Sequence, residues 1–329
     1  MTDFRTSIAP EHFPFRIHHH SPTLCIGSCF AKHIGKRMEL YKFPCLSNPL
    51  GIVYNPISIA QQLETIVQKG STLHSAQLFE HQGLWHHFLF HGSFSSADKE
   101  AMLSTLIAQS VRSRSILQAA GTLFITLGTA RVYIHKQSRA VVANCHKVPA
   151  DRFDRKLLSV EASTNVLSGI FEKLKKLNPS LEIVLTVSPI RHLRDGLVEN
   201  QQSKSTLLVA CTQLCQAFDY VYYFPAWEIM MDDLRDYRFY EADMIHPSLT
   251  AINYIWDYFK AGFFGEDTLQ LLPLIDKVVR AAQHRPFRSA SETHQAFLQK
   301  QLEEIAKLEQ QYPFLDFAKE RNVLKAQMV

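Results

Sequence analysis

The sequence lacks several patterns that would place it in a class at once. It contains no run of eighteen apolar residues, so no membrane-spanning helix is expected. Its six cysteines form no C-x-x-C pair, the spacing used by many redox and zinc motifs. Lysine and arginine form no long run and the formal charge is only +4, whereas nucleic-acid binding usually needs a concentrated basic face. We therefore expect no membrane span, no disulfide framework and no nucleic-acid partner.

The cysteines and the N-terminus favour a reducing compartment. At four-residue spacing in a helix, Cys211 and Cys215 would share one face and pack as small hydrophobic side chains. Residues 1–16 show no uninterrupted apolar core ahead of a cleavage site, which a secretory signal peptide would have. We therefore expect a cytoplasmic protein.

Strand and helix patterns alternate along most of the chain, which has 329 residues. The expected strands, apolar runs typical of buried parallel strands, are 23–26, 41–46, 122–127, 181–187 and 220–224. The expected helices, from their periodicity and caps, are 55–66, 99–119, 160–177, 203–218 and 248–264. A hairpin is expected at 131–136 and 140–143. This alternation predicts an α/β fold, a parallel sheet with helices on both faces.

The last part of the chain is expected to be a separate helical extension. We place the boundary between a main domain, 1–265, and the extension, 266–329. Within the extension an apolar stripe recurs at helical spacing: Leu298, Leu302, Ile305 and Leu308. Such a stripe usually packs into a core, and association of two chains through it is the alternative.

Ser28 stands where a nucleophile could be presented. It follows an apolar run and Gly27, and it precedes Phe30, Ile34 and Met38, which recur at the four-residue spacing of an amphipathic helix. A serine on a tight turn between strand and helix lies at the helix N-terminus, where free N–H groups favour developing negative charge. An ordinary helix cap is the alternative interpretation.

Asp243 and His246 form the second element. A histidine that acts as general base needs a carboxylate to fix its tautomer and to stabilise the imidazolium. An aspartate three residues ahead of the histidine can do this on one loop, and Pro247 stiffens the chain before the last helix of the main domain. The order along the chain is serine first, then aspartate and histidine together.

Residues 71–95 contain a histidine-rich patch that includes His87 and His91. Helical spacing of these two could hold zinc. The surrounding aromatic residues and glycines favour a hairpin instead, and no carboxylate or cysteine completes a zinc motif. A structural or substrate-lining role is therefore preferred, and no metal is expected.

Several ordered blocks of sequence resemble the GSCFA family. Gly27 to Ala31 spells the five residues of that name. The other blocks of this character are 48–56, 127–129, 142–147, 186–192 and 237–248. The resemblance covers most of residues 20–265. The family is similar to the SGNH, or GDSL-type, hydrolases, which implies a three-layer α/β/α, flavodoxin-like parallel sheet and an activity that removes acyl groups.

The resemblance assigns roles to individual residues. It implies Ser28 as nucleophile, His246 as base and Asp243 as the residue that orients the base. The N–H groups of Ser28 and Gly51 would form the oxyanion hole. Where SGNH enzymes have Gly-x-Asn, this chain has Gly128, Thr129 and Ala130, without the asparagine.

A replacement for the missing oxyanion donor is therefore needed. Asn144 is the preferred candidate, and Thr129 is the alternative. We expect Gly128, His146, Arg191 and His91 to line the substrate site, although Arg191 could equally be an ordinary surface arginine.

These features lead to four hypotheses of different kinds. The first is a serine esterase that hydrolyses a carbohydrate ester or a related small ester, without a cofactor. The second is O-acyl transfer to a sugar by the same three residues. The third is a binding protein that keeps the fold without catalysis, and the fourth is metal-dependent hydrolysis at the histidine-rich patch.

Overall fold

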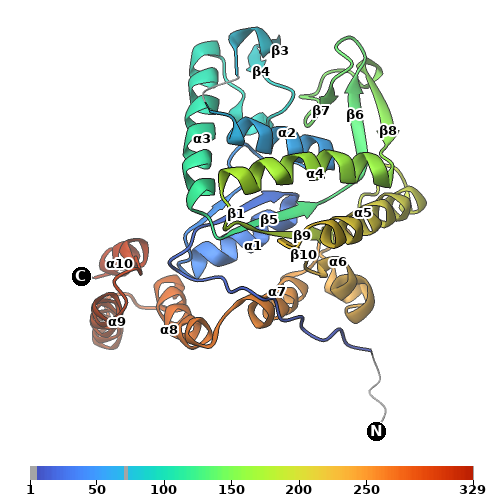
Figure 1. Cartoon of the computed structure of the whole chain (residues 1–329). Coiled ribbons are helices and arrows are strands. Elements are labelled where there is room, and N and C mark those ends of the chain that lie inside the picture. Colours follow the sequence, from blue (N-terminus) through green and yellow to red (C-terminus); the bar gives the residue numbers. More distant parts are fainter. Residues whose placement is uncertain (1–5, 70–72, 329) are drawn as a thin grey trace.

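The computed structural model describes residues 6–69 and 73–328 (Figure 1). Residues 1–5 and 70–72 of the expected main domain and residue 329 of the expected extension therefore lie outside the described residues. Its central sheet has five parallel strands in the order β10-β9-β5-β1-β2. They are β1 (Thr23–Gly27), β2 (Cys45–Ser47), β5 (Thr122–Leu127), β9 (Glu182–Val187) and β10 (Val221–Tyr223). The expected α/β fold with a parallel sheet is confirmed. Counted within this sheet, the order is 2-1-3-4-5, the order of flavodoxin-like folds.

The central strands are buried on both faces. Every side chain of β1 and of β5 is buried, because both strands lie between two neighbours and beneath helices on either side. Their continuous apolar sequences follow from that position. The strand expected at 41–46 is shorter, since Tyr41 caps the preceding helix and Lys42 adopts a positive φ of 65° in the turn that follows.

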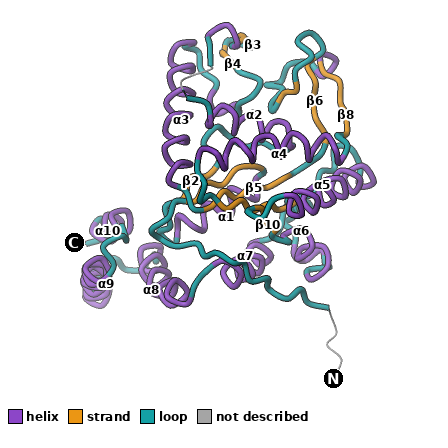
Figure 2. The backbone as a smooth tube through the Cα atoms, in the orientation of Figure 1, coloured by secondary structure: helices purple, strands orange, loops and turns teal. Residues whose placement is uncertain are grey.

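One face of the sheet is covered by α1 (Cys29–Leu40) and α7 (Leu249–Phe263) (Figure 1). Phe30 and Ile34 of α1 and Phe259 of α7 belong to the same buried cluster as Phe124 of β5. The N-terminal loop is drawn in Figure 2 as a teal tube that crosses these helices. It adds Phe13, whose ring stacks on that of Phe263 with 4.1 Å between the centroids. Burial of these rings, each worth a few kcal/mol, fixes the layer.

The other face is covered by four helices: α2 (Pro56–Val67), α3 (Lys99–Ala119), α4 (Val160–Leu177) and α5 (Leu197–Ala217). The expected limits of α3 and α4 are confirmed residue for residue. Asp98 and Ser159 cap them, each accepting hydrogen bonds from backbone N–H groups of the first turn. Helix α5 begins six residues earlier than expected, after Gly196, whose φ is 93°.

Two small antiparallel sheets lie outside the central one. A hairpin of β3 (Phe79–His81) and β4 (Leu84–His86) lies in the histidine-rich patch, but His87 and His91, which were expected on one face of such an element, follow it in a loop; residues 71 and 72 of the patch lie outside the described residues. The second hairpin expected is formed by β6 (Arg131–His135) and β7 (Val141–Val142). A strand that was not predicted, β8 (Phe153–Leu157), pairs with the other edge of β6. This second sheet flanks the carboxyl edge of the central sheet.

The last helices are α8 (Glu266–Gln283), α9 (Glu292–Gln311) and α10 (Ala318–Lys325). They share a buried cluster of their own, and Leu298, Ile305 and Leu308 of the predicted stripe lie inside it. The stripe therefore packs within the chain. A salt bridge of 2.6 Å between Lys42 and Glu320 joins the extension to the main domain.

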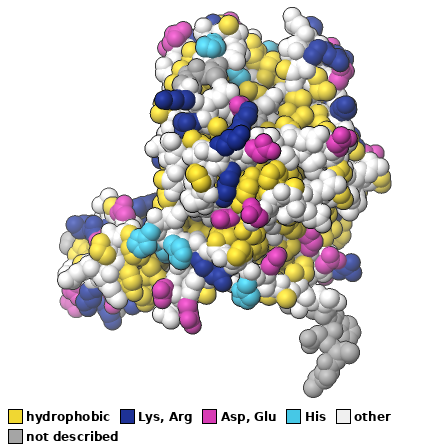
Figure 3. All heavy atoms as spheres, in the orientation of Figure 1, with side chains coloured by type: hydrophobic (Ala, Val, Ile, Leu, Met, Phe, Trp, Pro, Cys, Tyr) yellow, Lys and Arg dark blue, Asp and Glu magenta, His cyan; other side chains and the backbone are white. Residues whose placement is uncertain are grey.

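The distribution of charge on the surface and the character of the helices can be compared with the sequence-based expectations. On the face that Figure 3 shows, basic and acidic side chains are interspersed rather than segregated. Within the described ranges, no helix combines the length and the apolar character that crossing a membrane requires.

Candidate active site

The site lies at the carboxyl edge of the sheet, where the strand order reverses. Strand β1 has β2 on one side and β5 on the other, so the connections that follow β1 and β2 leave in opposite directions. Ligands of open α/β sheets bind in the crevice at such a point. Gly27 makes the close approach possible: its φ is +133°, and a Cβ there would lie 2.1 Å from the carbonyl oxygen of Thr126.

Ser28 is the N-cap of α1 and is almost fully buried, with 2% of its surface exposed. Its Oγ accepts a hydrogen bond from the N–H of Phe30 at 3.3 Å. Its own N–H donates to the carbonyl oxygen of Thr126 at 3.1 Å. The hydroxyl therefore stands at the positive end of a helix of twelve residues, as the sequence predicts.

Asp243 and His246 are paired. The Nδ1–H of His246 donates to Oδ2 of Asp243 at 2.6 Å. The other carboxylate oxygen accepts from the N–H groups of Ile245 and His246, at 2.9 and 3.0 Å. These hydrogen bonds, those from His246 foremost, lower the pKa of Asp243 to about 2. The carboxylate thus fixes the tautomer that leaves Nε2 of His246 with its lone pair.

The loop that carries this pair is closed on itself. Tyr240 and Pro247 form an antiparallel bridge, and the N–H of Glu241 donates to the carbonyl of His246 at 2.7 Å. Met244, at the turn, has a φ of 58°. Ser248 then caps α7 through its side chain. Because both ends of the loop are fixed, the imidazole is delivered to the sheet edge at a defined position.

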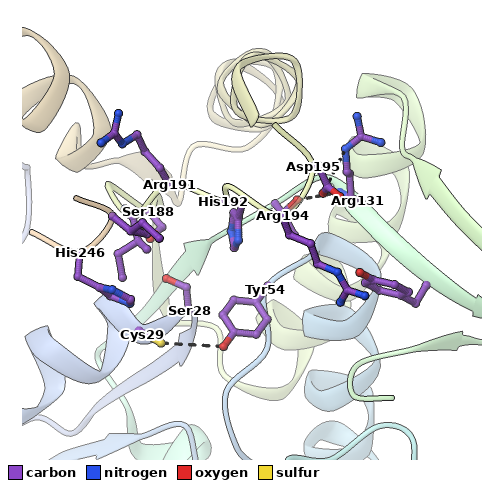
Figure 4. A pocket seen from close by; sticks show the side chains of 14 residues that line it. Ser28, Cys29, Tyr54, Arg131, Ser188, Arg191, His192, Arg194, Asp195 and His246 are labelled. Carbon is purple, nitrogen blue, oxygen red and sulfur yellow. Dashed lines mark hydrogen bonds and ion pairs between the residues drawn. The ribbon is translucent and has the colours of Figure 1, made fainter. Parts of the chain in front are cut away.

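Ser28 and His246 line the same cavity, which has a volume of about 380 Å³ (Figure 4). Figure 4 shows the two side chains on the same side of the cavity, beside Cys29. Within the described residues, no hydrogen bond joins the hydroxyl of Ser28 to the imidazole; Oγ accepts from the N–H of Phe30, and Nδ1 of His246 is bonded to Asp243. Rotation of the Ser28 side chain about its Cα–Cβ bond would break the hydrogen bond from the N–H of Phe30 and turn Oγ toward a different neighbour.

Two of the expected oxyanion donors are engaged elsewhere. The N–H of Ser28 is bonded to Thr126, as described above, and the N–H of Gly51 donates to the carbonyl of Asn48 at 2.9 Å. Gly51 also lies outside the cavity of Ser28, in a neighbouring surface pocket with His91. In this arrangement neither N–H is available to an oxyanion, because each already donates to a backbone carbonyl oxygen.

The candidates for the third donor are separated from one another. Asn144 lines a second cavity and accepts a hydrogen bond from the N–H of His146 at 2.8 Å. Thr129 lines both cavities, but its N–H donates to Tyr54 at 3.0 Å and its hydroxyl is 3.0 Å from the hydroxyl of Ser203. The structure therefore places Thr129, and not Asn144, on the cavity that holds Ser28.

An N–H group that the sequence reasoning missed is free. Cys29 is the first residue of α1 and lines the cavity, and its N–H has no acceptor among the described residues. The first N–H groups of a helix have no intrahelical partner. The N–H of the residue after a nucleophilic serine is a common oxyanion donor. A serine directly before a predicted helix was the sequence signal that could have identified the N–H of Cys29 as a free donor.

Arg191 is one of the residues that line the cavity, and in Figure 4 its guanidinium points away from the centre of the pocket. Its guanidinium lies over the Tyr240 ring, 4.4 Å from the centroid, and donates to the carbonyl of Met244. Gly128 lies against Ser28 instead of lining a cavity; a Cβ there would be 3.4 Å from that of Ser28 and 3.2 Å from the Tyr54 ring. Of the two, Arg191 lines the cavity of Ser28, as expected, whereas Gly128 lies against Ser28 and lines neither of the two cavities.

His91 and His146 line the second cavity. His146 is buried, and its Nε2 lies 2.9 Å from the carbonyl oxygen of His87; burial lowers the pKa of His146 and that of His87 to about 4. The two are therefore uncharged at neutral pH. Among the described residues, no three His, Cys, Asp or Glu side chains gather in a way that could hold a metal ion.

Two further residues of the Ser28 cavity were not singled out from the sequence. The Tyr54 ring forms a wall, its hydroxyl 3.9 Å from the Cys29 thiol. His192 lies edge-on to that ring, with centroids 6.1 Å apart, and burial lowers its pKa to about 4. Behind them, the fully buried Lys204 donates to the carbonyl of Ser188 at 2.7 Å. Only the position of His192 after a buried strand could have indicated its place.

Comparison with known proteins defines the family. No curated protein matches the chain in sequence. The profile of the GSCFA family matches residues 22–259, a span that contains Ser28, Asp243 and His246. The profile described as the GSCFA domain protein, C-terminal domain, matches residues 275–329, which cover the end of α8, α9 and α10. The chain therefore belongs to the GSCFA family.

Proposed function

We propose that this protein is a serine esterase of the SGNH-hydrolase type, which removes an acyl group from a carbohydrate ester or a related small ester. One observation carries the proposal. A serine at a helix N-terminus and a carboxylate-paired histidine, from opposite ends of the main domain, line one cavity at the switch point of the sheet. The strand order and the sequence blocks favour the SGNH type.

The first half of the reaction forms an acyl-enzyme. Oγ of Ser28 attacks the ester carbonyl carbon while its proton passes to Nε2 of His246. The carbonyl π electrons move to oxygen, and the N–H of Cys29, at the positive end of α1, faces the resulting oxyanion. When the tetrahedral intermediate collapses, the C–O bond to the alcohol breaks and the imidazolium returns the proton to the departing oxygen. Asp243 stabilises the imidazolium between these steps.

The second half releases the acid. A water molecule takes the place of the alcohol and gives its proton to Nε2 of His246 as it attacks the acyl carbon. Collapse of this intermediate breaks the bond to Oγ of Ser28, which recovers the proton from the imidazolium. The net change is ester plus water to alcohol plus acid, and the protein needs no further reactant.

The test is a serine substitution with a matched control. S28A is expected to abolish labelling by a fluorophosphonate probe and hydrolysis of p-nitrophenyl acetate, with a circular dichroism spectrum like that of the wild type. S159A removes another N-cap serine, which accepts from the N–H of Ala162 at 3.0 Å and lines none of the cavities described above. It should lose about 1 kcal/mol of stability and keep full activity. Unchanged turnover in S28A would rule out the mechanism.

Transfer of the acyl group to a sugar instead of water uses the same three residues. The second cavity, of about 450 Å³, adjoins the first and has room for an acceptor. Product analysis with and without an added alcohol separates the two reactions, since transfer gives a new ester and hydrolysis gives only the acid.

A further inference from the structure

Two adjoining cavities, here called the groove, lie at the sheet edge. Five residues line both of them, which makes the cavities neighbours along a shared wall: Tyr54, Thr129, Arg131, Tyr133 and Arg194. The first cavity holds Ser28 and His246, and the second extends beneath the β6–β7 hairpin toward Asn144 and His146. A substrate whose ester lies at Ser28 would therefore extend past this wall into the second cavity.

The charges along this groove are nearly all positive. The second cavity is lined by Arg131, Lys147 and Arg194 and by no aspartate or glutamate. The first cavity contributes one carboxylate, that of Asp195. Asp195 is already shared: its Oδ2 lies 3.6 Å from Nε of Arg131, and it also pairs with Arg155. The groove thus has an excess of positive charge at its midpoint, although the whole chain is only mildly basic.

Arg194 is the cation best placed to meet a ligand. Its guanidinium lies 5.5 Å from the centroid of the Tyr133 ring, and within the described residues no carboxylate pairs with it. Figure 4 shows its side chain reaching across the right-hand side of the pocket, in contrast to Arg191, which turns away, and Arg194 also lines the second cavity. Lys147, exposed and also without a carboxylate partner among the described residues, stands at the other side of the second cavity.

His146 and His192 do not add to the positive charge of this groove. His146 lines the second cavity and His192 the first, and burial holds the pKa of each imidazole at about 4. At neutral pH they offer uncharged hydrogen-bonding nitrogens. Arginine forms paired hydrogen bonds with carboxylate and phosphate groups, and a ring stacked on the guanidinium restricts its orientation.

We propose that the second cavity binds an anionic group, a carboxylate or a phosphate, on the part of the substrate remote from the ester. Arg194 is its main contact, and Lys147 contributes at the rim. This inference rests on the proposed esterase function, because that function makes the bound anionic group a part of the ester substrate. It makes the substrate class an acylated sugar acid or sugar phosphate, in preference to a neutral ester.

Binding is tested first, in a protein that cannot turn over an ester. Glucose 6-phosphate, glucuronate and glucose are titrated by calorimetry into the S28A variant. Both anionic sugars, or one of them, should bind at least tenfold more tightly than glucose, and the affinity should fall as salt is raised. A preference for glucose 6-phosphate identifies phosphate, and a preference for glucuronate identifies carboxylate. Equal affinity for all three sugars, or no binding by any, would overturn the inference.

Two substitutions locate the binding group. R194Q, in the S28A background, should weaken binding of the preferred sugar by at least about tenfold, since hydrogen bonds to charged groups are the strong ones. K147Q should give a smaller loss. The control is K156Q, which makes the same charge change on β8 at an exposed residue that lines neither cavity. An equal loss in K156Q would mean that only the overall charge matters and would contradict the site.

Hydrolysis separates this inference from the function on which it rests. In the active protein, R194Q should lower kcat/KM for 4-acetoxybenzoate about tenfold more than kcat/KM for phenyl acetate, because these esters differ by one carboxylate. Hydrolysis of both esters without any effect of R194Q would reject the anion site and keep the esterase. Anionic sugar binding in a protein that hydrolyses neither ester would reject the esterase and keep the site.

Discussion

The guanidinium of Arg191 lies 4.4 Å from the centroid of the Tyr240 ring and also donates a hydrogen bond to the carbonyl of Met244. This contact joins the segment after β9 to the loop that carries Asp243 and His246. The pair itself is half exposed, with 45% and 44% of the two side chains open to solvent. Its position therefore depends on the loop, and Arg191 adds a contact to the hydrogen bonds by which the loop closes on itself.

Removing that contact should lower the rate without removing any reacting group. R191M is expected to reduce kcat for p-nitrophenyl acetate at least about tenfold, with a smaller change in KM, because a base displaced by about 1 Å transfers protons poorly. R191K should recover little, since an ammonium cannot stack flat on a ring. R238Q, an exposed arginine of the same loop region, is the control and should keep its rate. A full rate in R191M would show that the loop holds itself.

The carboxylate of Asp243 should matter through the tautomer of His246. In D243N the amide oxygen can still accept from the backbone, but its NH₂ group cannot accept from Nδ1–H. We expect kcat to fall by about 10²-fold or more. D236N changes a neighbouring aspartate that makes a similar backbone hydrogen bond, 2.8 Å from the N–H of Arg238, and should have little effect. Equal losses in both variants would indicate damage to the loop alone.

Lys204 should make stability depend on pH in the alkaline range. Burial lowers its pKa from 10.5 to about 7, so the unfolded chain binds the proton more tightly than the folded one. The cost of burial is fully present below pH 7 and is relieved as the pH rises toward 10.5. K204M, which keeps packing on Trp227, removes this dependence. Its advantage in unfolding free energy over the wild type should shrink by roughly 2 kcal/mol between pH 7 and 9, measured with urea.

Acid should destabilise the protein through its buried imidazoles. The pKa of His87 and that of His146 are lowered from 6.5 to about 4 by burial. Below pH 6.5 the unfolded chain takes up protons that the folded chain refuses, so stability falls as pH falls and levels off below about pH 4. Between pH 7 and 5 each histidine should contribute on the order of 1–2 kcal/mol. A variant with H87Q and H146Q should show a visibly smaller decrease in urea unfolding; an identical decrease would contradict the assignment.

Gly27 and Gly169 should respond to alanine with opposite signs. G27A places a Cβ 2.1 Å from a backbone oxygen at a φ of +133°, and we expect a loss of at least about 3 kcal/mol in unfolding free energy. Gly169 lies inside α4 with open space where a Cβ would stand. G169A should therefore raise stability by up to about 1 kcal/mol. Thermal unfolding of both variants gives the comparison, and a tolerated G27A would show that the turn can rearrange.

Much of the fold could be predicted because its signals are local. Helices α3 and α4 begin after Asp98 and Ser159, side chains that satisfy the first free N–H groups of a helix, and their limits match the prediction. The buried strands β5 and β9 are apolar on both faces because both faces are covered. Strand β8 was missed, since its sequence, Phe153 to Leu157, is mostly charged and exposed and is held by pairing with β6.

The sequence by itself determined most of the elements, the family and the residues that follow each strand at the sheet edge, since these depend on spacing along the chain. Only the tertiary structure decided which of those residues face the cavity. Arg191 turns to the Tyr240 ring whereas Arg194 turns to the groove, and the N–H of Ser28 is used by Thr126 whereas that of Cys29 is free. Neighbours in sequence diverge in direction, and their partners come from distant segments, so local spacing did not show which side chain or N–H group would face the cavity.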